Sequence, residues 1–127
     1  MSIQSLQIVG IPPTLNEVRR MHHFEQAKSK AWWEQMVQIE SKVQKLQPIN
    51  PPVIMTYRFH FTDRRRRDPD GYAYSAKSIQ DGLVKSGILP DDNFQVVREL
   101  RIAEGEKKKK AGITIEIREV GESHDEE

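Results

Sequence analysis

The sequence contains no cysteine, and this absence removes two classes of chemistry at once. Neither a disulfide framework nor a thiolate metal site can form, and the natural expectation is an intracellular, reducing compartment. No apolar run approaches the roughly 20 residues that a membrane-spanning helix needs. The start, Met1-Ser2-Ile3-Gln4, also lacks the basic and apolar stretches of a signal peptide. We therefore expect a cytoplasmic protein without a membrane partner.

The charge is unevenly distributed along the chain. The 127 residues carry a formal net charge of only +1, yet the last six hold four acids and no lysine or arginine. The rest of the chain is therefore more basic than the total suggests, and a polyanionic partner is plausible. The length fits one domain, which we place at residues 1–120, followed by an acidic, mobile tail at 121–127.

Periodicity and proline positions predict the order strand, helix, strand, helix, strand, strand. Pro12-Pro13 ends the first strand, and Pro48 with Pro51-Pro52 ends the first helix. This order predicts an α/β (α+β) fold in which two helices cover a mixed sheet. The expected elements are strand 3–11, a loop at 14–23, helix 24–46, strand 53–61, helix 74–86, strand 94–103 and a last strand at 113–118.

Two of these elements have clear patterns. In the second strand, alternate side chains share one face: Val53, Met55, Tyr57, Phe59 and Phe61. In the first helix, a stripe at steps of four and three is expected to be buried: Trp32, Met36, Ile39, Val43 and Leu46. Of the neighbours Trp32 and Trp33, we expect one in the core and one nearer the surface.

Two acidic pairs, separated by one predicted helix, are the candidate metal ligands. Asp68 and Asp70 are two residues apart, so on an extended segment both project from one face. Asp91 and Asp92 follow the helix at the start of a later strand. Mg²⁺ prefers oxygen ligands and keeps several waters, so a few carboxylates suffice to hold it. A divalent cation neutralises phosphate charge and activates water, which phosphodiester hydrolysis requires.

Two basic runs are candidate contacts for the DNA backbone. Arg64, Arg65, Arg66 and Arg67 directly precede Asp68, and Lys107, Lys108, Lys109 and Lys110 precede the last strand. Excess positive charge beside a metal suits a DNA phosphate. Each feature also has a simpler interpretation. Asp68-Pro-Asp-Gly71 is a good turn sequence, an arginine run is commonly a solvated patch, and the lysines fit an exposed hairpin tip.

The combination of these motifs resembles the RusA family of Holliday junction resolvases. The resemblance rests on the segment from Phe61 to Asp70, on a helix with Lys77, and on the segment from Asp81 to Asp92. Pro12-Pro13-Thr14-x-Asn16 is similar to the turn after the first strand of the family. The resemblance implies a RusA-like fold and a dimeric endodeoxyribonuclease, of a type common in phages and prophages. It also implies Mg²⁺ as cofactor, with Mn²⁺ as a substitute, and branched DNA as substrate.

The resemblance also assigns roles to residues. It implies catalytic roles for Asp68, Asp70, Asp92 and Lys77, and makes Asp91 an acidic neighbour of the metal. One departure stands out, because the family pattern is Asp-x-Asp-Asn-x-x-Lys, whereas Gly71 replaces the asparagine and Lys77 comes three residues later. The extra residues fall within Gly71–Ser75. They either lengthen a loop harmlessly or displace the lysine. The alternative function is a branched-DNA-binding protein of the same fold without catalysis, and a general flap nuclease is a third.

Overall fold

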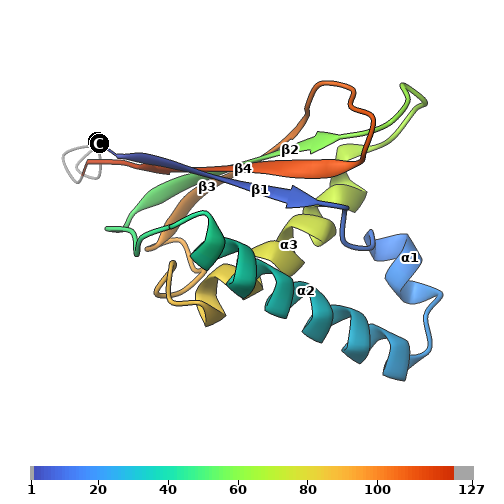
Figure 1. Cartoon of the computed structure of the whole chain (residues 1–127), viewed down its shortest axis with the longest axis horizontal. Helices are drawn as coiled ribbons and strands as arrows, with labels where there is room; N and C mark the ends of the chain where they lie inside the picture. The colour runs from blue at the N-terminus through green and yellow to red at the C-terminus, as the bar shows by residue number, and fades with distance from the viewer. Residues whose placement is uncertain (1, 122–127) are drawn as a thin grey trace.

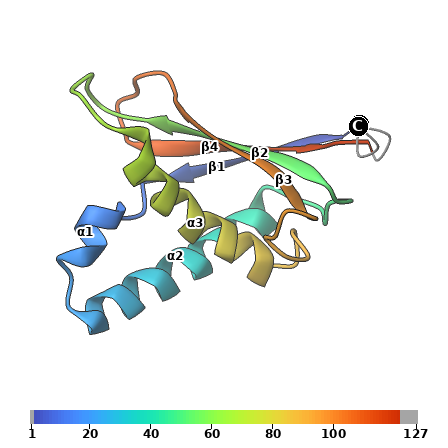
Figure 2. The same cartoon turned by 180° about the vertical axis from the view of Figure 1, so that it is seen from behind.

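One four-stranded sheet carries all of the helices on a single face in the computed structural model, which describes residues 2–121 (Figures 1 and 2). The expected order of strands and helices is confirmed, with one added short helix. The elements are β1 (Ile3–Val9), α1 (Leu15–Arg19), α2 (His23–Val43), β2 (Val53–His60), α3 (Pro69–Lys85), β3 (Val97–Glu104) and β4 (Gly112–Glu119). None of the helices within residues 2–121 is both long and apolar enough to cross a membrane. Most of the expected acidic tail, residues 122–127, lies outside the described residues.

The added helix α1 lies where the sequence analysis expects a loop. Its start is fixed by a reciprocal capping box, in which the Glu17 N–H donates to Oγ1 of Thr14 and the Thr14 N–H donates to Oε1 of Glu17. The sequence Thr14-x-x-Glu17 is itself the signature of this motif. The helix was therefore predictable from local pattern, although none of its residues is buried.

The sheet is mixed, in the order β1-β4-β2-β3. β2 pairs parallel with β3 and antiparallel with β4. β3 and β4 are therefore not neighbours, and the connection 105–111 must cross the end of β2. Backbone hydrogen bonds from Gly105 to Phe59 (2.8 Å) and from Lys108 to Phe61 (2.9 Å) tie this crossover down. The expectation of a hairpin tip at the four lysines is wrong, because a hairpin needs two adjacent strands.

The core lies between the sheet and the helices. The five side chains predicted to share a face of β2, from Val53 to Phe61, all belong to the buried core. Alternate residues of β4 complete this layer: Ile113, Ile115 and Ile117. Among residues 2–121, no helix covers the far face of the sheet (Figures 1 and 2).

Three residues of the stripe that was expected to be buried face solvent, whereas Leu46, just after α2, is buried as expected. Trp32 is 51% exposed, Ile39 49% and Val43 66%. The buried residues of the helix are instead Glu34, Val37 and Ser41. Spacing shows only that residues share a face; contacts with other elements decide which face is buried. The neighbouring tryptophan, Trp33, packs against the core, so the expected division of the pair is confirmed.

The contact between α2 and α3 selects this orientation. Gly82 on α3 lies against Val37, and a Cβ added at Gly82 would lie only 2.7 Å from the Cβ of Val37. On the same interface, the carboxylate of Glu34 is 7% exposed and accepts a hydrogen bond from Nζ of Lys85 at 2.8 Å. This bond raises the pKa of Lys85. Small and polar side chains thus occupy the interface that the apolar stripe was expected to fill.

We expect Gly82→Ala to destabilise the fold by about 1–3 kcal/mol, because the new methyl group overpacks the helix contact. Gly71→Ala, in the same helix, is the matched control. Its Cβ would meet only Thr14, at an ordinary 3.9 Å, so the change should stabilise the fold by roughly 0.5–1 kcal/mol through helix propensity. Urea unfolding of both variants measures the difference. Equal effects of the same sign would contradict the close contact.

Candidate active site

Asp68 and Asp70 lie at the start of α3. The helix begins at Pro69, five residues earlier than expected, and Asp68 is its N-cap residue with an extended backbone. The two carboxylates therefore straddle a helix start and do not share the face of an extended segment. Proline in the first helical position is a common start signal, and the helix dipole favours acidic groups there. The Asp68 side chain makes no capping hydrogen bond and is 69% exposed.

Asp68 and Asp70 line a cleft of about 450 Å³, and residues of α1 line the same cleft. Two separate motifs of the sequence meet in it, the proline-rich turn before α1 and the acidic segment before α3. The turn supplies Thr14 to the wall, and α1 supplies Asn16 and Arg19. Arg19 is a candidate that sequence reasoning missed, since its segment looked like a loop. The lining is Thr14, Leu15, Asn16, Arg19, Arg66, Arg67, Asp68, Asp70, Gly71 and Tyr72.

Lys77 lies two turns along α3 from Asp70. The three extra residues of the chain are helical, so of the two alternatives the structure contradicts the lengthened loop and leaves the displaced lysine. Seven residues turn a helix through nearly two full turns and advance it by about 10 Å, so both side chains leave nearly the same side of the helix. Lys77 does not line the cleft of Asp70. It lines a neighbouring groove with His23 and Tyr74, and its Nζ lies 3.3 Å from Oδ1 of Asp81.

Asp91 and Asp92 lie at the opposite end of the molecule. Their loop is held at the start of β2, where the Val53 N–H donates to the Val96 carbonyl at 2.7 Å. Asp68 follows the end of the same strand. An eight-residue strand is about 26 Å long, and the seventeen residues of α3 span a similar length between the two acidic pairs.

One chain therefore does not gather the predicted metal ligands. Within residues 2–121, no group of three or more histidine, cysteine, aspartate or glutamate side chains could hold a metal ion. The two acidic pairs cannot surround one metal within a single chain, because α3 carries the chain back along the sheet from the end of β2 to its start and so separates the pairs by its own length. The roles of Asp68, Asp70, Asp91, Asp92 and Lys77 stay predictions.

The four arginines are not equivalent in the structure. Arg67 folds back, with its side chain only 14% exposed and its guanidinium 3.9 Å from the centre of the Phe61 ring. It donates to Oδ1 of Asp63 at 2.8 Å and to the backbone carbonyls of Asp63 and Arg65. The hydrogen bond from Arg67 holds the pKa of the Asp63 carboxyl below its usual value. Arg67 therefore shapes the loop before α3.

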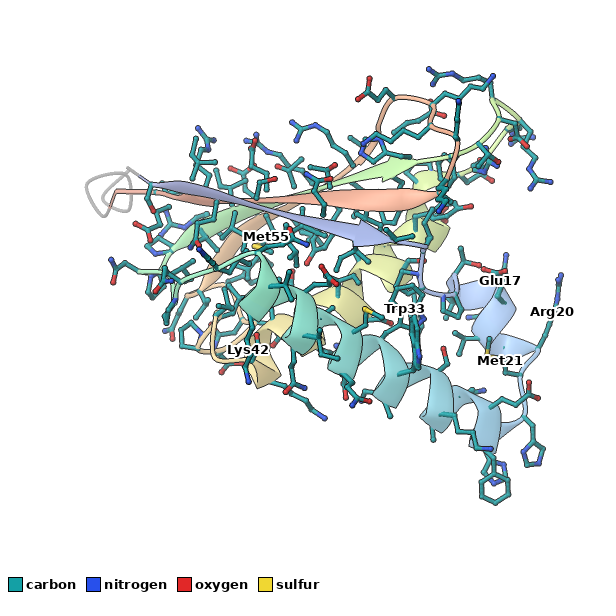
Figure 3. The ribbon with its side chains drawn as sticks, in the orientation of Figure 1. Glu17, Arg20, Met21, Trp33, Lys42 and Met55 are labelled. Atoms are coloured by element: carbon teal, nitrogen blue, oxygen red, sulfur yellow. The ribbon has the colours of Figure 1, made fainter. Side chains whose placement is uncertain are left out.

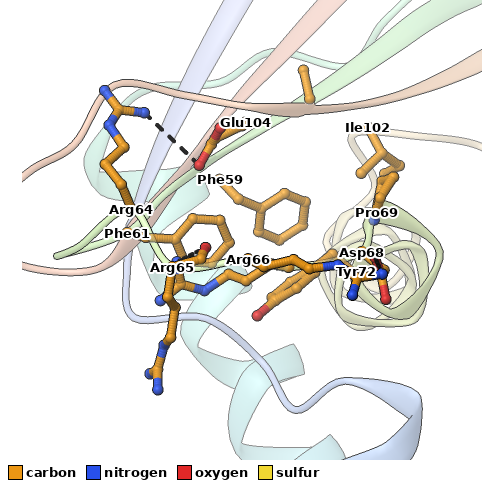
Figure 4. Close-up of a pocket in the computed structure, with 12 residues that line it drawn as sticks. Phe59, Phe61, Arg64, Arg65, Arg66, Asp68, Pro69, Tyr72, Ile102 and Glu104 are labelled. Atoms are coloured by element: carbon orange, nitrogen blue, oxygen red, sulfur yellow. Dashed lines mark hydrogen bonds and ion pairs between the residues drawn. The ribbon is translucent and has the colours of Figure 1, made fainter.

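The other three arginines point outward from the same loop. Arg66 is 90% exposed, Arg65 75% and Arg64 59%, and each lies 3.6 to 3.8 Å from a carboxylate oxygen. They rim a cavity of about 440 Å³ beside Asp68 (Figure 4). Three aromatic rings line that cavity and pack on one another: Phe59, Phe61 and Tyr72. The exposed guanidinium groups remain available for phosphates.

The lysine run is exposed on the crossover connection. Lys108, Lys109 and Lys110 line a hollow of about 650 Å³ together with His60. His60 is 5% exposed, and its ring nitrogens lie 3.0 Å from the Glu106 carbonyl and 2.7 Å from Oγ1 of Thr114. This buried histidine anchors the segment that presents the lysines. All four lysines of the run are exposed: Lys107, Lys108, Lys109 and Lys110.

Comparison with known protein families gives one match. The model described as Endodeoxyribonuclease RusA matches residues 11–118, a range that contains every candidate residue named above. No curated protein matches the chain. The matched range starts at the proline-rich turn and ends in β4, so it includes the cleft and both acidic pairs.

Proposed function

Because the chain belongs to the RusA endodeoxyribonuclease family, we propose that it cuts four-way DNA junctions by Mg²⁺-dependent hydrolysis of phosphodiester bonds. The observation that carries this proposal is the cleft at the start of α3. There, Asp68 and Asp70 share a wall with Arg66 and Arg19. Carboxylates for a cation and guanidinium groups for a phosphate thus stand side by side.

The residues present fit Mg²⁺. The ion is bound in proteins through one or two carboxylates while it keeps several waters. Asp68 and Asp70 offer two carboxylates at the wall of an open cleft, and the one partner of Asp68 found among the described residues, Arg66, lies at 3.6 Å. When bound, Mg²⁺, or Mn²⁺ in its place, supplies charge neutralisation at the scissile phosphate and activation of water near neutral pH.

Exposed basic side chains of the protein position the DNA. Arg65 and Arg66 are exposed and charged at every relevant pH, so they bind backbone phosphates near the cut. The lysine run (Lys107–Lys110) holds an adjoining stretch of backbone in the same way. Lys77 neutralises charge that develops on the leaving oxygen. Since it lies in the groove beside His23, this role requires the DNA to pass over both hollows.

A homodimer would complete the acidic site. One chain presents Asp68 and Asp70 at one end and Asp91 and Asp92 at the other. Two copies placed side by side and antiparallel would bring the second pair of one copy to the first pair of the other. Two-fold symmetry would then create two identical sites, as paired nicks in a four-way junction require.

The proposal is tested with a synthetic four-way junction, the wild-type protein and Mg²⁺. We expect paired, symmetric nicks that leave 5′-phosphate and 3′-hydroxyl ends, and no cutting of the matched linear duplex. Chelation of the metal should stop the nicking but leave junction binding intact. A flap substrate cut as fast as the junction would indicate a general structure-selective nuclease. The absence of nicks with either Mg²⁺ or Mn²⁺ would contradict the nuclease assignment.

A branched-DNA-binding protein without catalysis is the second candidate function. The observation that favours it is the position of Lys77, one helical turn farther from Asp70 than the family pattern implies. Such a protein would bind the junction with equal affinity in Mg²⁺ and in chelator, and would leave every strand uncut.

A further inference from the structure

Three adjacent aromatic side chains are exposed where α2 begins, at the end of the helix that lies away from the sheet (Figure 1). They are His22, His23 and Phe24, here called the aromatic tip. Their rings pack on one another, with centroids 4.2 Å apart between the two histidines and 4.3 Å apart between His23 and Phe24. Phe24 is nevertheless 66% exposed. A contiguous exposed patch of this kind is typical of a surface that binds a partner.

The backbone at the start of the helix holds the aromatic tip in place. His22 is the N-cap residue, and its Nδ1 accepts from the Phe24 N–H at 3.3 Å. In return, the His22 N–H donates to Oε1 of Glu25 at 3.4 Å, which completes a capping box. The His22 ring cannot rotate freely while it makes this bond. The tip is therefore ordered before it meets a partner, and an ordered surface loses less entropy on binding.

Positive charge surrounds the aromatic tip. Residues 19–30 contain four lysine or arginine residues and a single acid, Glu25. Figure 3 shows the Arg20 side chain extending into solvent close to Met21. Aromatic rings among exposed cations are complementary to a nucleotide, which combines a planar base with a charged phosphate. The four basic side chains, all exposed, are Arg19, Arg20, Lys28 and Lys30.

The aromatic tip adjoins both hollows of the candidate active site. Arg19, three residues before the tip, lines the cleft of Asp68 and Asp70. His23 itself lines the groove that holds Lys77. DNA that passes over both hollows therefore meets the tip close to the acidic residues.

We propose that the aromatic tip stacks on an exposed nucleobase at the branch point of the DNA, while Arg19 and Arg20 bind the adjoining phosphates. This inference deepens the proposed function and rests on its branched substrate. In a linear duplex, the neighbours of each base cover both of its faces. At a branch point the stack of bases is interrupted, so exposing a base costs least there. Because every base has a π-face, stacking tolerates any sequence, and the tip selects the shape of the DNA.

Phe24→Ala tests the stacking. We expect the dissociation constant for a synthetic four-way junction to rise roughly tenfold or more, as the loss of one stacked base implies. The constant for a linear duplex of the same arm sequence should change by less than about twofold, because phosphate contacts dominate that binding. Fluorescence anisotropy in chelator measures both constants without cutting. Urea unfolding should show unchanged stability, since Phe24 is exposed.

Two further substitutions at this position separate stacking from simple apolar contact. Phe24→Tyr keeps the ring and should bind the junction within about threefold of wild type. Phe24→Leu keeps an apolar side chain without a π-face and should lose as much affinity as Phe24→Ala. The matched control is Val43→Ala. Val43 lies on the same helix and is also 66% exposed, but it lines neither hollow, so junction binding should be unchanged.

A fluorescent base reports the stacking directly. 2-Aminopurine is quenched by neighbouring bases, so a junction that carries it at the branch point becomes brighter when that base leaves the stack. The wild-type protein should increase the fluorescence. Phe24→Ala, at concentrations that saturate the junction, should leave the fluorescence close to that of the free DNA.

The outcomes separate this inference from the proposed function. Equal loss of junction and duplex binding in Phe24→Ala, or a Phe24→Leu variant that binds like wild type, would overturn the stacking role. Nicking of the junction by the wild-type protein is measured independently and decides the nuclease assignment. A protein that cuts junctions, but binds them equally well as Phe24→Ala, would keep the first proposal and lose the second. A protein that needs Phe24 for junction binding, but leaves every strand uncut, would do the reverse.

Discussion

Asp70→Asn should abolish junction cleavage while junction binding persists. The substitution keeps the size of the side chain but removes the charge that would hold a divalent cation at the cleft. We expect the cleavage rate to fall by roughly 10³-fold or more, at least the effect of losing one strong electrostatic contact to a transition state. Binding should be unchanged or tighter, because a negative charge near the DNA backbone is removed. Single-turnover cleavage and fluorescence anisotropy in chelator measure the two quantities.

Glu25→Gln is the control for this variant. Glu25 is also an acid in the first turn of a helix, at the start of α2, but it does not line the cleft. The Glu25→Gln variant should cut junctions at close to the wild-type rate. If Asp70→Asn retained near wild-type cleavage, Asp70 would not be a metal ligand. If it lost binding as well, the carboxylate would have a structural role that its exposed position does not indicate.

Mixing two inactive variants should restore activity. Asp70→Asn and Asp92→Asn, each alone, damage every site of a dimer. In a mixed dimer, one site would receive both substitutions and the other would receive neither. After exchange of subunits at equal concentration, half of the dimers are mixed, so about a quarter of the wild-type sites are expected to return. The assay counts nicks in the junction before and after the two proteins are mixed.

This recovery occurs only if the two acidic pairs of a site come from different chains. If each site formed within one chain, the mixture would stay as inactive as its components. The control is a mixture of Asp70→Asn with Asp68→Asn. Both substitutions lie at the same end of the chain, so every mixed site is damaged and no recovery is expected. Recovery in the control mixture would contradict the arrangement.

Only a structure reveals why such a test is needed. In the sequence, the two acidic pairs look like two walls of one site because a single helix separates them. Figure 3 shows how α2 and α3 lie beneath the sheet, with Trp33 and Met55 between these layers. α3 runs alongside the sheet from one end to the other, so its two ends cannot meet. The length of α3 and the positions of its contacts decide this, and neither follows from the motif alone.

The sequence by itself determined the order of the strands and helices, the residues that share a face of β2 and the grouping of motifs that marks the family. These depend on local signals: a period of two, proline positions and contiguous residues. The tertiary structure decided which side of α2 is buried, because the contact between Gly82 and Val37 joins residues far apart in the chain. It also decided that Arg67 supports a loop while Arg66 faces solvent. Equivalent residues in a run acquire different roles once their surroundings differ, and only the folded chain supplies those surroundings.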